Sequence, residues 1–263
     1  MISDALLEHV DLPLEDYYIC YFDILGYKDF LENNPESHKK FLLDVILSDG
    51  NISSIIRNAS SPVSIQYRTY SDNFLIAFEK KSVDETKALY LLSKIVRKIQ
   101  VVLLSEHKII VRGGITVGEF FCDDKIVFGP GLIRAVELES KYAKMPRIVI
   151  DKECLKEAVI ELEKKEIILK DTDEYYYVNY FDNENALKLI RGSCVNLINK
   201  NCKYHPTVKD ESKILLKEKT IGKYIWILMK FNEGCDVNSI EDMKIVYNLS
   251  INTRLFKTEV TCK

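Results

Sequence analysis

The stretch YYICYFDILG, residues 17–26, decides how this sequence begins to fold. Tyr17 to Ile24 is rich in aromatic and β-branched residues, as expected of a short strand, and Leu25-Gly26 ends the run. From Pro35 to Ala59 the apolar residues recur at helical spacing, so a strand is followed by a helix. Asp23 is an acid near the end of an otherwise apolar strand, a place where a folding core seldom holds a charge.

Two further β-rich runs predict a hairpin. Val63 to Tyr70 and Phe74 to Phe78 are separated by Ser71-Asp72-Asn73, a small polar group suited to a tight turn. Asp72 therefore stands at the predicted tip of the hairpin.

A second helix and a second set of strands follow. The helix is predicted from about Ser82 to Glu106, opened by a Ser-x-x-Glu capping box at Ser82 and Glu85. The remaining elements are a strand over Ile109 to Phe121, a turn at Asp123-Asp124-Lys125, a short strand from Ile126 to Phe128, a helix from Gly131 to Lys144 and a strand from Arg147 to Ile150. This order predicts an α+β, ferredoxin-like arrangement, with helices packed on one face of a mostly antiparallel sheet.

The pattern changes after Asp151. The rest of the chain predicts a helix, a hairpin around Asp171-Thr172-Asp173 and then lysine-rich helical segments. We therefore divide the chain into a first domain, residues 1–151, and a mainly helical C-terminal extension, residues 152–263, that can pack on the same domain.

The composition excludes several classes of protein. With 47% hydrophobic and 29% charged residues the chain is of ordinary globular type, and a net charge of -3 gives no broad basic surface for nucleic acid. The seven cysteines form no CxxC pair, which favours reduced thiols in the cytoplasm. No secretion signal is present, and the longest apolar run, KYIWILMKF, is too short to span a membrane, so we expect a soluble, cytoplasmic protein.

Asp23 and Asp72 are the candidate metal ligands. In the predicted fold both carboxylates can converge at one end of neighbouring strands, and two hard oxygen anions suit Mg²⁺ or Mn²⁺. Such a two-metal site activates a hydroxyl and neutralises a leaving pyrophosphate. Taken singly, each acid has an ordinary alternative, Asp23 as a helix N-cap and Asp72 as a turn residue.

These residues carry a family resemblance. FDILG (residues 22–26) and RTYSDN (68–73) resemble the two metal motifs of class III nucleotidyl cyclases, and three later blocks resemble the rest of that catalytic domain: RGGITVGE (112–119), FGPGLIRAVELES (128–140) and PRIVID (146–151). The resemblance implies that Mn²⁺ or Mg²⁺ is held by the carboxylates of Asp23 and Asp72 and the backbone carbonyl of Ile24. It also implies a homodimer whose active sites are shared between two subunits.

The chain departs from the purine-specific members of that family at three positions. Where those enzymes have an asparagine and an arginine on the third helix, this chain has Ile133 and Glu137, and their purine-reading lysine is Arg68. A carboxylate cannot stabilise a phosphate that accumulates negative charge, so an active enzyme needs another cation. The candidates are Arg112, Arg134, Arg147 and Arg68, and we place Arg112 first because Gly113-Gly114 beside it permits close approach of a ligand.

Other residues have both a functional and a structural interpretation. Glu137 can form a surface pair with Arg134 and Lys141 on the same helix face. Arg68 and Tyr70 can line a base pocket or simply cover a sheet face. The candidate substrate-binding residues are Arg68 and Tyr70 together with three residues of the first metal motif, Phe22, Leu25 and Gly26.

The full set of motifs is most similar to the pyrimidine cyclases of the bacterial Pycsar antiviral system. That resemblance implies conversion of UTP or CTP to 3′,5′-cyclic UMP or cyclic CMP plus pyrophosphate, as a second messenger that activates a separately encoded effector. A purine cyclase with a relocated arginine is one alternative, and an inactive cyclase-like domain that binds a nucleotide is another. A polymerase palm or a diguanylate cyclase is disfavoured because the hairpin tip reads YSDN in place of a GGDEF-type sequence.

Overall fold

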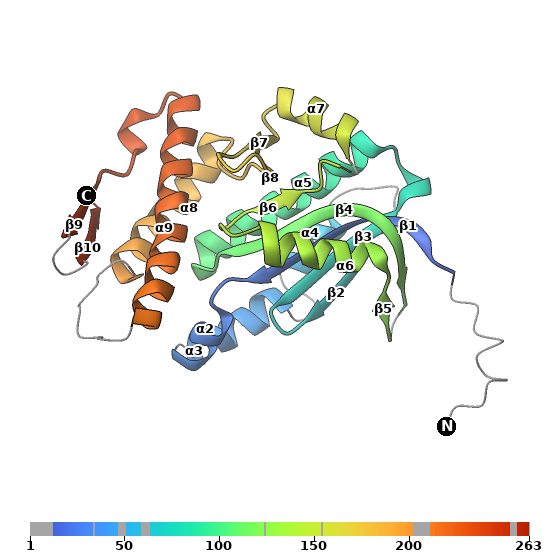
Figure 1. The fold of residues 1–263 in the computed structure, drawn as a ribbon, viewed down its shortest axis with the longest axis horizontal. Helices are drawn as coiled ribbons and strands as arrows, with labels where there is room; N and C mark the ends of the chain where they lie inside the picture. Colours follow the sequence, from blue (N-terminus) through green and yellow to red (C-terminus); the bar gives the residue numbers. More distant parts are fainter. Residues whose placement is uncertain are drawn as a thin grey trace.

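The protein is built around one mixed β-sheet (Figure 1). The computed structural model describes residues 13–33, 35–46, 51–58, 64–123, 125–153, 155–201, 211–252 and 257–262. The sheet order is β2-β3-β1-β4-β6-β8-β7, and β5 pairs with β4. Its strands are β1 (Glu15–Ile24), β2 (Gln66–Tyr70), β3 (Asn73–Glu79), β4 (Val111–Cys122), β5 (Val127–Phe128), β6 (Ile148–Ile150), β7 (Ile168–Lys170) and β8 (Tyr176–Val178).

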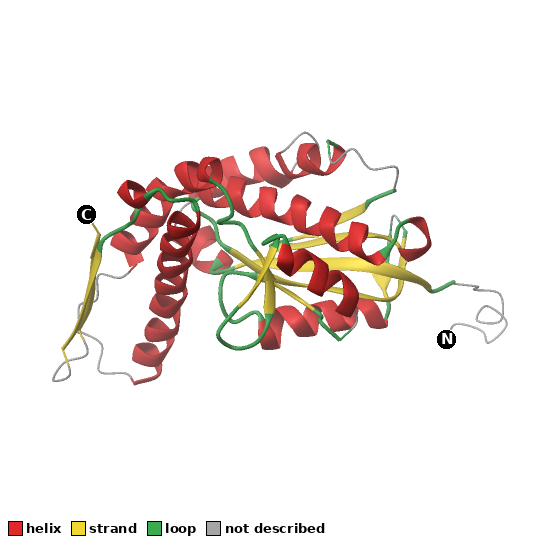
Figure 2. Ribbon diagram, turned by 90° about the horizontal axis from the view of Figure 1, so that it is seen from above, coloured by secondary structure: helices red, strands yellow, loops and turns green. Residues whose placement is uncertain are grey.

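Helices cover both faces of the sheet (Figure 2). The helices of the described residues are α2 (Tyr27–Asn33), α3 (Pro35–Phe41), α4 (Asn51–Arg57), α5 (Glu85–Val102), α6 (Pro130–Glu137), α7 (Lys156–Lys164), α8 (Glu184–Asn201) and α9 (Glu211–Val237). Single π-helical turns continue α3, α5 and α6 over Leu42–Ile46, Leu103–His107 and Leu138–Tyr142, and 3₁₀ turns lie at Lys80–Ser82 and Glu241–Met243. No helix in the described ranges is long and apolar enough to cross a membrane.

The central strand β1 shows how the two faces are used. Its neighbours β3 and β4 both run antiparallel to it, so it is hydrogen-bonded along both edges. Successive side chains of a strand point to opposite faces. Cys20 and Phe22 lie in the main core with residues of α5, whereas Ile19 packs with Ala135 of α6 on the other face.

The α+β fold class expected from the sequence is confirmed, with one difference in the position of the third helix. We expected the helices on one face, yet α6 lies on the opposite face from α5. Glycines permit this close packing: a Cβ on Gly131 would lie 2.6 Å from Cδ1 of Ile19 and 3.0 Å from the backbone of Gly118. The helix therefore rests directly on the sheet.

Most predicted elements of the first 151 residues are present with shifted ends. The β2–β3 hairpin with its turn at residues 71–72, the long strand β4 and strand β6 all occur. The predicted helix from Pro35 to Ala59 is instead α3, a π-helical turn and α4. Ala59, Val63 and Asp124 lie outside the described residues.

The predicted start of the long helix was wrong. Helix α5 begins at Glu85, and its N-cap is Asp84, whose side chain accepts a hydrogen bond from the backbone N–H of Lys87. Ser82 belongs to the preceding 3₁₀ turn, so it cannot cap α5. A carboxylate at the N-cap satisfies an otherwise unpaired N–H and also faces the positive end of the helix dipole.

The C-terminal part extends the same sheet. The hairpin predicted around residues 171–173 forms, and its strand β8 pairs antiparallel with β6 while β7 pairs with β8. Helices α8 and α9 pack together in a second hydrophobic cluster that includes Leu187, Phe231 and residues that precede β4. Strands β9 (Tyr247–Asn252) and β10 (Lys257–Cys262) form a separate two-stranded sheet, which the sequence did not lead us to expect.

Candidate functional site

Asp23 and Asp72 lie at the same end of the sheet. Asp23 is paired with Asn73 across β1 and β3, so it is level with the turn that carries Asp72. The backbone N–H of Ile24 donates to the backbone carbonyl of Asp72 at 3.2 Å, which ties the end of β1 to this turn. Ser71 adopts a left-handed conformation (φ 58°), which the tight turn requires.

Arg112 is placed directly against Asp23. The two residues are opposite each other in the antiparallel pair of β1 and β4, so their side chains share a face. Nε of Arg112 donates to Oδ1 of Asp23 at 3.1 Å and Nη2 donates to Oδ2 at 3.2 Å. This fork-to-carboxylate geometry is a strong form of ion pair.

Glu139 is a further carboxylate at this end of the sheet, and the sequence analysis did not identify it. It comes from the π-helical turn after α6, and its Oε1 lies 2.6 Å from Nη2 of Arg112. Burial raises the pKa of Glu139 to about 7, the negative charge of Asp23 adds to this rise, and Arg112 opposes it. One guanidinium is thus shared by two carboxylates.

Tyr21 and Asn73 link the acids to the sheet. The hydroxyl of Tyr21 donates to Oδ1 of Asn73 at 2.5 Å, and Nδ2 of Asn73 donates to Oδ1 of Asp72 at 3.3 Å. Burial raises the pKa of Tyr21 to about 12, and the charge of Glu139 contributes in the same direction. The tyrosine therefore stays protonated and acts as a hydrogen-bond donor that positions Asn73.

The glycines beside Arg112 are required by the protein's own packing. A Cβ on Gly114 would overlap Cβ of Leu138, and a Cβ on Gly113 would lie 2.5 Å from Cβ of Phe22. The expectation that these glycines leave space for a ligand is therefore not met. The absence of a side chain at Gly114 instead lets the turn that carries Glu139 rest on β4, and Gly113 makes room for Phe22 of β1.

The side chains of Arg68 and Phe22, two of the predicted substrate-binding residues, have partners away from Asp23 and Asp72. The guanidinium of Arg68 donates from Nη2 to the backbone carbonyl of Asp123 at 2.9 Å, beyond the end of β4 that is distant from Arg112. Phe22 is fully buried and stacks on Phe74 in the core, because its side chain faces away from that of Asp23. Only the backbone of Phe22 is near the acids.

The other three predicted substrate-binding residues remain at the surface or between clusters. Tyr70 is 48% exposed. Leu25 is partly buried and packs against the cluster of α8 and α9. Gly26 has a positive φ of 76° and its carbonyl accepts a hydrogen bond from Phe30, so it begins α2.

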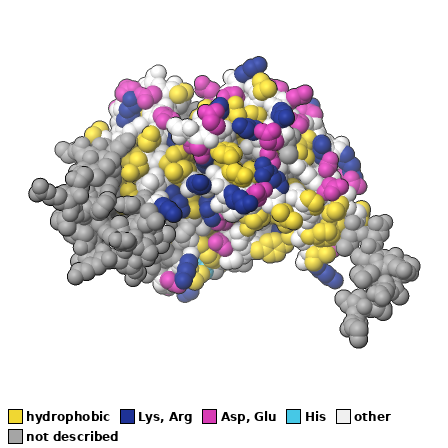
Figure 3. All heavy atoms as spheres, viewed as in Figure 1, with side chains coloured by type: hydrophobic (Ala, Val, Ile, Leu, Met, Phe, Trp, Pro, Cys, Tyr) yellow, Lys and Arg dark blue, Asp and Glu magenta, His cyan; other side chains and the backbone are white. Residues whose placement is uncertain are grey.

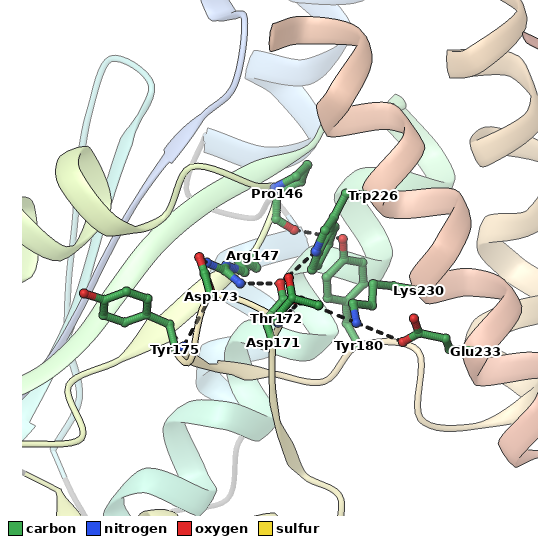
Figure 4. A network of polar contacts seen from close by, with 10 residues as sticks. All are labelled: Pro146, Arg147, Asp171, Thr172, Asp173, Tyr175, Tyr180, Trp226, Lys230 and Glu233. Carbon is green, nitrogen blue, oxygen red and sulfur yellow. Dashed lines mark hydrogen bonds and ion pairs between the residues drawn. The ribbon is translucent and has the colours of Figure 1, made fainter. Parts of the chain in front are cut away.

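The remaining candidate arginines have other partners. Arg134 binds Asp151 through Nε at 2.7 Å and also pairs with Glu137 at 2.9 Å. Lys141 lies 3.0 Å from Glu137, so the predicted surface pairing of this glutamate on its helix is confirmed. Arg147 is completely buried and pairs with Asp171 and Asp173 of the β7–β8 turn (Figure 4).

The donor set at this end of the sheet suits a hard divalent cation. Within the described residues no group of three or more His, Cys, Asp or Glu side chains is arranged to hold a metal ion. Two aspartates suffice when phosphate oxygens and water supply the other ligands, as is usual for Mg²⁺ at nucleotides. Burial is the main cause of the raised pKa of Glu139, and the negative charges of Asp23 and Asp72 add to it; a divalent ion would offset these neighbouring charges.

Lys223 of α9 is a second residue that the sequence analysis missed. Burial lowers the pKa of its ammonium group, the positive charge of Arg112 lowers it further, and the charge of Asp23 opposes both effects. The signal was present in KYIWILMKF, where Lys223 and Lys230 are seven residues apart and so share one helix face. We used that stretch only to exclude a membrane span.

Comparison with known proteins gives matches among solved structures. No protein-family model matches the sequence, and no curated protein matches it. The structure is similar to the guanylyl cyclase domain of the RhoGC fusion protein from the aquatic fungus Blastocladiella emersonii, with 15% identity, a TM-score of 0.45 and coverage of 63% of this chain and 95% of that chain. It is also similar to an adenylate/guanylate cyclase/hydrolase from Silicibacter pomeroyi, with 17% identity, a TM-score of 0.39 and coverage of 63% and 95%. A bacterial light-regulated adenylyl cyclase matches with 17% identity, a TM-score of 0.44 and coverage of 71% of this chain and 58% of that chain.

Proposed function

We propose that the protein is a pyrimidine nucleotide cyclase that converts UTP or CTP to the 3′,5′-cyclic monophosphate and pyrophosphate. The observation that carries the proposal is the position of Asp23 and Asp72 at one end of adjacent strands, with Arg112 on the same face as Asp23. Two carboxylates beside a guanidinium provide sites for divalent cations and for phosphate oxygens. The order of the cyclase-like motifs in the sequence supports the same conclusion.

The reaction needs no reactant besides the triphosphate. A bond forms between the ribose 3′ oxygen and the α-phosphorus, the 3′ hydroxyl gives its proton to water, and the bond from the α-phosphorus to the oxygen of the departing pyrophosphate breaks. The carboxylates of Asp23 and Asp72 and the carbonyl of Ile24 would hold the metal ions. When bound, such ions lower the pKa of a hydroxyl and neutralise charge on the phosphates.

Arg112 is the residue best placed to act on the phosphates. Its planar fork fits a phosphate as well as a carboxylate, so it can exchange Asp23 for phosphate oxygens when the substrate binds. Its positive charge then offsets the negative charge that develops on the α-phosphate and the leaving group. Glu137 cannot take this part because its side chain is an anion, and in the structure its carboxylate pairs with Arg134 and Lys141.

The preference for a pyrimidine rests on the resemblance and on Arg68. The purine-reading lysine of related cyclases is replaced by Arg68, and this side chain is bound to the β4–β5 turn. A purine cyclase with a relocated arginine is the alternative. The product would serve as a second messenger for a separately encoded effector in defence against phage.

A homodimer is part of the proposal. Figure 3 shows hydrophobic side chains gathered over α6, β5 and β2. Exposed apolar residues in these elements and their connections include Ile133 at 72%, Tyr70 at 48%, Ile126 at 46% and Phe128 at 37%. Exposed apolar surface of this kind favours association with another protein surface, and we propose a second copy of the chain.

An inactive, nucleotide-binding domain is the second candidate function. The observation that favours it is that Arg112 donates to both oxygens of Asp23, which an ion at Asp23 must displace at least in part. The test is to incubate the purified protein with Mn²⁺ and each of the four ribonucleoside triphosphates, and to identify the products by mass spectrometry. We expect cyclic UMP or cyclic CMP, and chelation of the metal should abolish its formation.

Matched variants make this test specific. Asp72→Asn should lower turnover at least ~100-fold because it removes a ligand charge needed only for chemistry. Asp16→Asn is the control, since Asp16 is an exposed aspartate at the opposite end of β1. Cyclic AMP or cyclic GMP as the sole product would overturn the pyrimidine assignment, and no cyclic product from any triphosphate would favour the inactive domain.

A further inference from the structure

The C-terminal helix α9 shares a hydrophobic cluster with residues that lie two positions from Asp23 and from Arg112. Ile110, two residues before Arg112, belongs to the hydrophobic cluster that also contains Ile227 of α9. Leu25, two residues after Asp23, packs against the same cluster. In Figure 1 this helix passes beside the end of the sheet where β1 leads into α2.

One face of α9 is fixed against the sheet by a buried polar network (Figure 4). Nε1 of Trp226 donates to Oδ2 of Asp171 at 2.8 Å, and Nζ of Lys230 lies 3.5 Å from Oδ1 of the same residue. Arg147 also binds Asp171, and its backbone carbonyl accepts a hydrogen bond from the N–H of Gly113 at 3.1 Å. The network thus connects α9 to the residue that follows Arg112.

Lys223 lies on this same face. It precedes Trp226 by three residues and Lys230 by seven, which is the spacing of side chains along one stripe of a helix. It is half-buried. Burial lowers the pKa of its ammonium group, the positive charge of Arg112 adds to this lowering, and the charge of Asp23 opposes it. No carboxylate of the described residues forms an ion pair with it within 4 Å, unlike Lys230 on the next turns.

A partly desolvated cation next to another cation is unfavourable unless an anion binds there. We propose that Lys223 binds the phosphate chain of the substrate, so that the C-terminal helix completes the active site. The identity of the substrate rests on the proposed function. Lys223 then supplies, beside Arg112, a second positive charge in a chain that has Glu137 where related cyclases have an arginine.

The experiment compares three variants of the full chain. Lys223→Met removes the charge and keeps the length of the side chain, Lys223→Arg keeps the charge, and Lys219→Met is the control on an exposed position of the same helix. Binding of inorganic tripolyphosphate in the presence of Mg²⁺ is measured by calorimetry, and kcat and KM are measured with the triphosphate that the wild type cyclises. Thermal unfolding verifies that each variant is folded.

We expect Lys223→Met to weaken tripolyphosphate binding by about 10- to 100-fold, the usual effect of losing a hydrogen bond to a charged group. The value of kcat/KM should fall by a similar factor, while Lys223→Arg and Lys219→Met stay within about threefold of the wild type. Equal binding by Lys223→Met and wild type, or no binding by the wild type, would overturn the inference. Binding that depends on Lys223 without cyclisation of any triphosphate would leave the phosphate site standing and refute the proposed function instead.

Discussion

The buried pair of Arg147 and Asp171 allows a sharp test of what holds the C-terminal part to the sheet. Arg147 has no exposed surface, and the side chain of Asp171 is only 4% exposed. Replacing Arg147 by Met keeps an unbranched side chain in the same space but removes the charge. Asp171 then keeps only Lys230 at 3.5 Å and the hydrogen bonds from Trp226 and from the backbone N–H of Thr172.

The size of the effect follows from this loss of partners. Removing one member of a buried ion pair costs about 3–5 kcal/mol, because a carboxylate remains in a low-dielectric interior without its main counter-charge. Neutralising both members should be far less costly, so the double variant Arg147→Met/Asp171→Asn should recover part of the lost stability. Lys165→Met serves as the control, because it removes an exposed ion pair with Glu161 and should leave the free energy of unfolding almost unchanged.

The assay uses the protein's single tryptophan, Trp226, which donates a hydrogen bond to Asp171. Urea unfolding followed by the fluorescence of Trp226 reports on the network. When the slope of free energy against urea concentration is the same for two variants, their midpoints give the difference in free energy of unfolding. We expect a loss of about 3–5 kcal/mol for Arg147→Met. A loss below about 1 kcal/mol, or a double variant less stable than Arg147→Met, would refute the account of this network.

Three other predictions follow from the same structure. Burial alone would raise the pKa of Asp171, but hydrogen bonds from Thr172 and Trp226 and the charges of Arg147 and Lys230 hold it below its ordinary value. Its contribution to stability is therefore complete above pH ~4 and is lost at lower pH, so the stability difference between wild type and Asp171→Asn should shrink on acidification, as measured by unfolding at a series of pH values. Gly114→Ala should cost about 1–3 kcal/mol because its Cβ would overlap Leu138, and it should lower turnover by displacing Glu139; unchanged stability and turnover would show that the turn can move freely. Asp84→Ala should lower the melting temperature whereas Ser82→Ala should not, since Asp84 caps α5. A larger fall in melting temperature for Ser82→Ala than for Asp84→Ala would show instead that Ser82 is the cap.

Local patterns in the sequence were enough to predict the strands and most helices of the first 151 residues. Alternating apolar residues and the small turn around Asp72 predicted the hairpin, and with it the end of the sheet where both aspartates lie. The cap of α5 was mistaken because Ser82–Glu85 matches the capping-box spacing equally well. Only the structure shows that Ser82 ends the preceding 3₁₀ turn and that Asp84 is the N-cap of α5.

Long-range contacts explain the residues that the sequence analysis missed or misplaced. Glu139 and Lys223 are distant from Asp23 in the chain, and no local spacing relates them to it. For Arg68 the sequence left open a base pocket or a covered sheet face, and it gave no sign that the guanidinium would bind the Asp123 carbonyl, 55 residues further along the chain. Helix α6 was placed on the wrong face because periodicity shows which side of a helix is apolar but does not show which face of a sheet it covers.

The β7–β8 hairpin has a consequence for how this polypeptide can be divided. Val149 and Ile150 of β6 are paired with Tyr177 and Tyr176 of β8, so a fragment that stops at Asp151 would leave an open, apolar strand edge that invites aggregation. The same cut would strip Arg147 of every acidic partner described above. Grafting the first 151 residues onto another protein would therefore require carrying the β7–β8 hairpin and helix α9 along, and chimaeras are best joined outside residues 13–237.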